Sequence, residues 1–91
     1  MFLGKRIKEL REEKALLQRQ MAAELEIDTP MFSKIERGER KAKREQVIKM
    51  AEMLEADKNE LLTLWLAGQI YAILKDEIVA KAAINFIEKK L

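Results

Sequence analysis

The sequence of 91 residues contains no cysteine and no histidine, and it has only one proline and three glycines. The absence of cysteine and histidine excludes disulfides, metal sites built on thiolate or imidazole, and nucleophilic catalysis by a Cys-His or Ser-His pair. The sole serine, Ser33, has no imidazole to activate it. We therefore expect no enzyme activity, no cofactor and no bound metal.

Long hydrophobic runs are also missing from the sequence. The longest apolar stretch, residues 61–74, is interrupted by Thr63, Gly68 and Gln69 and is too short to span a bilayer. The N-terminus places charged residues directly after three apolar ones, which is the wrong order and length for a signal peptide. We expect a cytoplasmic protein that makes no contact with a membrane.

The residues that are abundant favour a helical protein. Charged residues make up 37% of the chain and apolar residues 48%, a balance that argues against disorder and against a β-sandwich. The length allows one domain, or one small domain with an appendage, so no separate ligand-binding domain is expected and no small-molecule ligand is evident. We predict an all-α fold.

Residues 18–41 have the pattern of two short helices joined by a tight turn and followed by a basic run. Apolar residues at helical spacing give each helix one apolar stripe, and both stripes can close onto one small core. These apolar residues are Met21, Ala22 and Leu25 in the first helix, Phe32 and Ile35 in the second, and Ile27 in the turn. This layout is typical of a helix-turn-helix that inserts its second helix into the major groove of DNA.

The limits of the second helix follow from local signals. Either Asp28 or Thr29 can be its N-cap, and Pro30 suits the first turn because that turn leaves its N–H groups unpaired. Gly38 stands where the chain leaves the helix in a left-handed conformation, which residues with a Cβ resist. With its last residue near Arg37, the helix has about two turns.

The distribution of charge is more informative than the net charge of +2. Residues 34–44 hold six basic side chains against the two acidic ones of Glu36 and Glu39, whereas residues 59–91 hold four of each sign. A charge run in isolation is more often a solvated loop. Its position beside the helix pair favours contact with DNA phosphates instead.

Further helices are predicted on both sides of the helix pair. Residues 3–14 and 44–54 each carry an apolar stripe, and Asp57 with Glu60 forms a capping box that opens a fifth helix from about Lys58. We predict a fold of four to five helices with a C-terminal helical extension, in which residues 1–57 form the helix-turn-helix DNA-binding domain. Residues 58–91 would form C-terminal helices that close the core and form a dimer interface.

The C-terminal helices expose more apolar surface than one small domain can cover. They run on as one rod or, as we favour, break at residues 75–77, so that residues 77–91 form a hairpin with the fifth helix. Gly68 either marks a close helix crossing or is a tolerated neutral residue. A two-fold dimer would cover the surplus surface, and its predicted interface comprises Leu62, Leu66, Ile70, Ile73, Leu74, Phe86 and Ile87. Alternatively, these helices bind a different protein, as in an antitoxin.

Residues 3–62 resemble the Xre and phage-repressor-like (lambda repressor-like) helix-turn-helix family of bacterial regulators. The most specific matches are Gln18, Ala22 and the pattern Ser33-x-Ile35-Glu36-x-Gly38. The resemblance implies a lambda-repressor-like fold and a transcriptional regulator of double-stranded DNA, a repressor or autoregulator being typical of the family. As a homodimer it would bind an inverted repeat with half-sites about 34 Å apart.

The resemblance also implies roles for individual residues. A structural ion pair would join Arg11 to Glu36. The predicted base contacts are Thr29, Pro30, Met31, Ser33 and Lys34, and the predicted phosphate contacts are Gln18, Arg37, Arg40, Lys41 and Lys43. Two departures from the family pattern concern helix ends. Leu17 replaces a capping Ser or Thr, which predicts a weakened or shifted cap, and Glu26 replaces a turn glycine, which predicts a slightly different turn or a strained residue. In a third departure, Ala42 replaces a common loop proline, which predicts a more mobile basic run.

Overall fold

The computed structural model describes residues 2–91, and every regular element in that range is an α-helix. The prediction of an all-α fold is therefore confirmed. The helices are α1 (Phe2–Glu13), α2 (Gln18–Glu24), α3 (Thr29–Glu36), α4 (Arg44–Leu54), α5 (Lys58–Leu74) and α6 (Ala80–Glu88).

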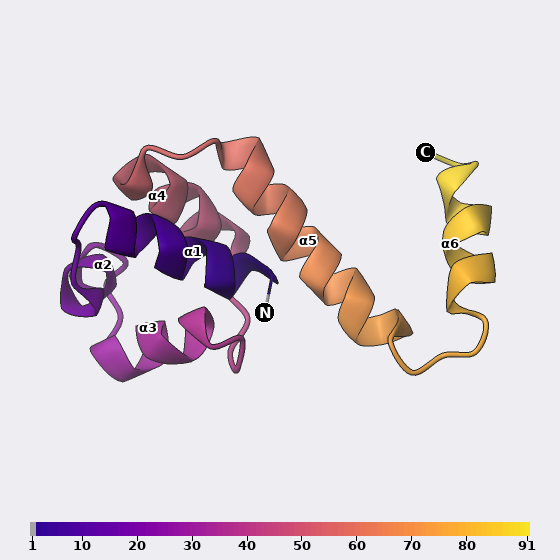
Figure 1. Cartoon of the computed structure of the whole chain (residues 1–91), viewed down its shortest axis with the longest axis horizontal. Helices are drawn as coiled ribbons and strands as arrows, with labels where there is room; N and C mark the ends of the chain where they lie inside the picture. Colours follow the sequence, from indigo (N-terminus) through magenta and orange to yellow (C-terminus); the bar gives the residue numbers. More distant parts are fainter. Residues whose placement is uncertain (1) are drawn as a thin grey trace.

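Helices α1 to α4 and the first half of α5 enclose one hydrophobic core, while α6 stands apart at the other end of the molecule (Figure 1). Helix α1 packs against α3, α4 and α5, and the other close pairs are α2 with α3 and α4 with α5. Leu61 of α5 is fully buried, and Leu64 and Trp65 pack against the core beside it. One side of α5 thus closes the core, as its apolar pattern predicted.

Four helices end in the same backbone motif, in which one residue adopts a left-handed conformation. These residues are Ala15, Glu26, Gly38 and Glu55, with φ angles of 55°, 58°, 76° and 52°. In each case the N–H groups of this residue and the next one donate to carbonyls in the last helical turn. Only Gly38 avoids the steric cost of a Cβ in this conformation, about 1–2 kcal/mol. Glu26 is therefore the strained residue that its place in the turn predicted.

The N-terminal ends of α2 and α3 differ in their capping. Asp28 is the N-cap of α3, since its Oδ1 accepts a hydrogen bond of 2.8 Å from the Met31 N–H. Leu17 precedes α2 and has no side-chain acceptor to offer, so only the reverse bond forms, from the Leu17 N–H to Gln20 Oε1 at 2.7 Å. The cap of α2 is weakened as predicted.

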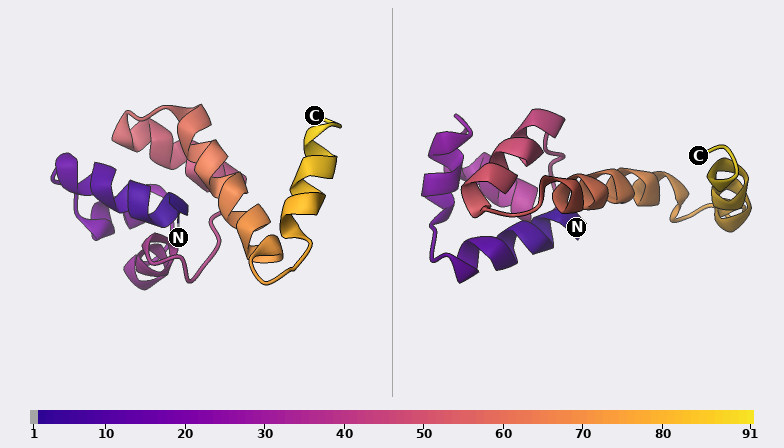
Figure 2. Two further views of the ribbon diagram at one scale, coloured as in Figure 1. Left: turned by 45° about the vertical axis from the view of Figure 1, so that its right-hand side comes forward. Right: turned by 90° about the horizontal axis from the view of Figure 1, so that it is seen from above.

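The C-terminal helices break where the sequence favoured a break, because α5 ends at Leu74 and α6 begins at Ala80. They form an open V rather than a closed hairpin, and seen from above α5 leaves the core and α6 lies at its far end (Figure 2). The radius of gyration is 14.6 Å, compared with about 12 Å for a compact chain of this length. No helix in the described part of the chain is long and apolar enough to cross a membrane.

Candidate nucleic-acid interface

Helix α3 buries one side and leaves the other free. Phe32 and Ile35 point into the core, with 0% and 4% of their surface exposed. The five residues predicted to contact bases lie on the remaining surface, where Thr29, Pro30 and Lys34 are exposed and Met31 and Ser33 are half-buried. The helix has eight residues, and the diameter of an α-helix with its side chains, about 10–12 Å, suits a major groove about 12 Å wide.

Helix α1 fixes the C-terminal end of α3 through a direct backbone contact at Gly4. A Cβ atom at Gly4 would lie 2.7 Å from the carbonyl oxygen of Ile35 and still closer to that of Glu36. Real Cβ atoms do not approach other atoms so closely, so only glycine permits this packing. Nothing local to α1 in the sequence signals this close approach from α3.

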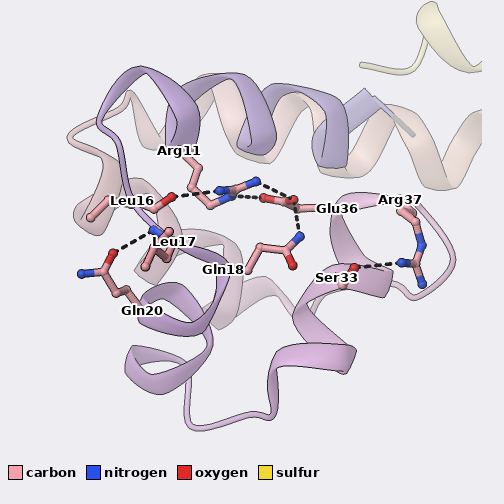
Figure 3. A network of polar contacts seen from close by, with 8 residues as sticks. All are labelled: Arg11, Leu16, Leu17, Gln18, Gln20, Ser33, Glu36 and Arg37. Atoms are coloured by element: carbon pink, nitrogen blue, oxygen red, sulfur yellow. Dashed lines mark hydrogen bonds and ion pairs between the residues drawn. The ribbon is translucent and has the colours of Figure 1, made fainter.

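A buried ion pair links the same two helices (Figure 3). Arg11 Nε lies 2.6 Å from Glu36 Oε2, and the two side chains are only 11% and 2% exposed. Arg11 Nη1 also donates to the carbonyl oxygen of Leu16 at 2.9 Å. The pair therefore joins α1, the loop after α1 and the end of α3 in one polar network.

Gln18 at the start of α2 belongs to this network as well. Its Nε2 donates to Glu36 Oε1 at 2.9 Å (Figure 3), an interaction that sequence reasoning missed. Within the described residues, no buried side-chain nitrogen or oxygen is left without a hydrogen-bond partner. One amide hydrogen of Gln18 is thus used inside the protein, and its contact with a DNA phosphate stays a prediction.

The predicted phosphate contacts after α3 lie on an exposed loop that is anchored to α5. Arg40, Lys41 and Lys43 are exposed, whereas Ala42 between them is buried. The carbonyl oxygen of Ala42 accepts a hydrogen bond of 2.8 Å from Trp65 Nε1. The cations thus project from a loop whose centre is fixed, and no local signal in the sequence identifies Trp65 as the residue that fixes it.

Arg37, at the end of α3, is bound by two neighbouring side chains. Its Nη1 donates to Ser33 Oγ at 2.8 Å (Figure 3), and its Nε lies 2.7 Å from Glu39 Oε2. The hydrogen bond from Arg37 and the charge of its guanidinium lower the pKa of the Glu39 carboxyl, and the same bond raises the pKa of Arg37. In the sequence, Glu39 is one of two acids in the basic run, and no local pattern identifies Arg37 as its partner.

The arrangement can bind a nucleic acid, because the free side of α3 is continuous with the exposed cations of residues 34–43. Within residues 2–91, no group of three or more carboxylates is placed to hold a metal ion.

The family model described as "Helix-turn-helix domain" matches residues 3–64, more than half of the chain. Neither the curated proteins nor the solved structures gave a significant match. The chain belongs to the helix-turn-helix domain family.

Proposed function

We propose that the protein is a sequence-specific DNA-binding transcriptional regulator of the Xre and phage-repressor-like type. It acts as a repressor or autoregulator and binds an inverted-repeat operator as a homodimer. The observation that carries this proposal is the accessible side of α3, which lies next to a cationic loop and opposite the α6 end of the molecule (Figure 1). Recognition helices of this family of motifs use such a side to reach base edges.

The residues on α3 and those on the loop have different roles in this proposal. Lys34 donates to guanine O6 or N7, while Pro30 and Met31 make apolar or shape contacts, for instance with a thymine methyl group. Thr29 and Ser33 contribute hydroxyl groups. The phosphate contacts, which orient the protein without selecting a sequence, come from Gln18, Arg37, Arg40, Lys41 and Lys43.

Selection of bound sequences from a random oligonucleotide pool tests the proposal and reports the symmetry of the operator. With the selected operator, log K should fall linearly against log salt with a slope of about −5 to −9 if the dimer binds roughly 6 to 10 phosphates. A slope near zero, or no enrichment from the pool, would contradict DNA binding as the function.

Two lysine substitutions should separate base contacts from phosphate contacts. Lys34→Ala should weaken binding about tenfold or more on the operator and little on unrelated DNA, because it removes a contact to a base. Lys41→Ala should weaken binding to all sequences alike and make the salt slope shallower by about 0.9 for each phosphate that the protein no longer neutralises. Fluorescence anisotropy measures both effects, and Lys49→Ala on α4 is the control. Equal effects of the first two variants would refute these roles.

The proposed dimer rests on the open V between α5 and α6. The V contains a groove with a volume of about 780 Å³, and its lining is mainly apolar. Apolar side chains gathered in an exposed groove are typical of an interaction surface, and a second copy of the chain would cover these. Of the predicted interface residues, those that line the groove are Ile70, Ile73, Leu74 and Ile87.

The other predicted interface residues lie outside the groove. Leu66 and Phe86 are 53% and 66% exposed, so both are accessible to a second copy. Leu62 is half-buried against the core of its own chain, which leaves less of its surface for a partner. The interface that we propose therefore extends beyond the groove along the outer sides of α5 and α6.

Ile73→Lys should dissociate the dimer without unfolding the chain, because the side chain is 73% exposed in the protomer and lines the groove. We expect the dissociation constant of the dimer to rise at least about tenfold, or 1.4 kcal/mol. Light scattering after gel filtration measures the mass. Ile78→Lys is the matched control, since Ile78 is fully exposed and does not line the groove. A wild-type chain that stays monomeric would favour the alternative of a different protein partner.

A further inference from the structure

Every nitrogen of the Arg37 guanidinium is engaged within the protein. Nη1 donates to Ser33 Oγ at 2.8 Å, and Nε and Nη2 donate to the two carboxylate oxygens of Glu39 at 2.7 and 3.4 Å. The Nε and Nη2 edge of arginine is one that also binds a phosphate with two parallel hydrogen bonds. In the free protein, Glu39 therefore occupies the two donors, Nε and Nη2, with which Arg37 would bind a DNA phosphate.

The backbone at the end of α3 holds Glu39 next to Arg37. The Glu39 N–H donates to the Lys34 carbonyl oxygen at 2.8 Å, just after Gly38 has reversed the chain with a φ of 76°. The side chains of Arg37 and Glu39 are both 55% exposed. Exposed ion pairs of this kind are weak and are screened by salt, so a phosphate can replace the carboxylate.

Glu39 is also out of place in the charge pattern around it. Residues 34–44 contain two acids, and Glu36 is buried against Arg11, so Glu39 is the exposed acid of this basic segment. It is therefore the acid that the guanidinium of Arg37 can bind in place of a phosphate. Neither the fold nor the core needs the Glu39 side chain, since it lies on the surface.

We propose that Glu39 is an internal competitor of the DNA backbone for Arg37. It binds the guanidinium in the free protein and is displaced when a phosphate takes its place, so that the ion pair, which must break first, lowers the affinity for every DNA sequence. This inference rests on the proposed function, because it assigns a role to Glu39 in DNA binding. In this proposal, Arg37 contacts a phosphate only after its ion pair with Glu39 has broken.

Glu39→Gln tests the proposal because it preserves the size of the side chain and removes its charge. We expect the affinity of the dimer for operator and for unrelated DNA to rise about tenfold, because one weak ion pair in each of its two protomers no longer has to break. In the wild type, the Glu39 carboxylate that a phosphate displaces takes up a cation from solution. The variant has no such carboxylate, so the slope of log K against log salt should become steeper by up to about 0.9 per protomer. Glu52→Gln makes the same change in net charge on an exposed residue of α4 that forms no ion pair within residues 2–91. That control should change the affinity less than twofold, roughly the effect of a distant screened charge.

A second background separates competition for Arg37 from a general effect of charge. In Arg37→Gln, the further change Glu39→Gln should alter the affinity less than about twofold, because no guanidinium remains to be released. A tenfold gain in that background would overturn the proposal, as would an unchanged or lower affinity for Glu39→Gln alone. If the wild type and all variants fail to bind DNA, the proposed function fails as well, a pattern distinct from binding that is insensitive to Glu39.

Discussion

Replacing Gly4 with alanine should lower the free energy of unfolding by about 3 kcal/mol, at the upper end of what overpacking costs. The added Cβ would collide with backbone carbonyl oxygens of α3, 2.7 Å away at Ile35 and closer at Glu36. Backbone atoms at the end of a packed helix cannot move aside as a flexible side chain can. For a domain of this size, the midpoint of thermal unfolding should fall by more than about 12 °C, measured by circular dichroism.

Gly68→Ala is the matched control for this prediction. The nearest atom to a Cβ at Gly68 would be Phe2 Cδ2 at 3.9 Å, an ordinary van der Waals contact. Because Gly68 lies inside α5, alanine should stabilise the protein by about 1 kcal/mol through its higher helix propensity. Within one chain, Gly68 does not mark a close helix crossing. If both variants lost stability equally, the close contact at Gly4 would not be the cause.

Arg11→Met should cost about 3–5 kcal/mol of unfolding free energy, because it leaves the buried carboxylate of Glu36 without its charged partner. Glu36 is only 2% exposed on its side chain, and Gln18 would be its remaining side-chain donor. Urea denaturation followed by circular dichroism measures the loss. The double variant Arg11→Met with Glu36→Leu should recover much of it, since no charge is then left unpaired in the core.

Arg6→Met offers a comparison on the same helix. Arg6 pairs with Glu60 of α5 at 2.9 Å, but the two side chains are 34% and 45% exposed. Exposed ion pairs contribute at most about 1 kcal/mol, so this variant should lose little stability. Similar losses for Arg6→Met and Arg11→Met would show that burial does not distinguish the two pairs, contrary to our interpretation.

The limits of α3 could be predicted from the sequence because they depend on neighbouring residues. Asp28 caps the helix, Pro30 fits its first turn, and Gly38 follows its end, each for a reason that a single turn of backbone supplies. The core followed from the same kind of regularity, since apolar residues at helical spacing have one side to bury. Most of the helix-turn-helix unit could be inferred in this way.

Other features of the candidate site depend on residues that meet only in the folded chain. The bond from Gln18 to Glu36 and the anchoring of Ala42 by Trp65 join segments that no periodicity relates. The direction of α6 was equally unpredictable, because residues 75–79 contain no glycine or proline to specify a turn. The apolar residues that could fix the position of α6 line a groove that one chain does not fill.

The hydrogen bond between Trp65 and the Ala42 carbonyl gives the protein a built-in optical probe. Trp65 is the single tryptophan of the chain, so indole emission comes from one place, directly beneath the cationic loop. Indole fluorescence depends on the polarity around the ring and on the partner of its N–H. Rearrangement of that loop during a titration can therefore be followed on unlabelled material, without attaching a dye to a chain that has no thiol to carry one.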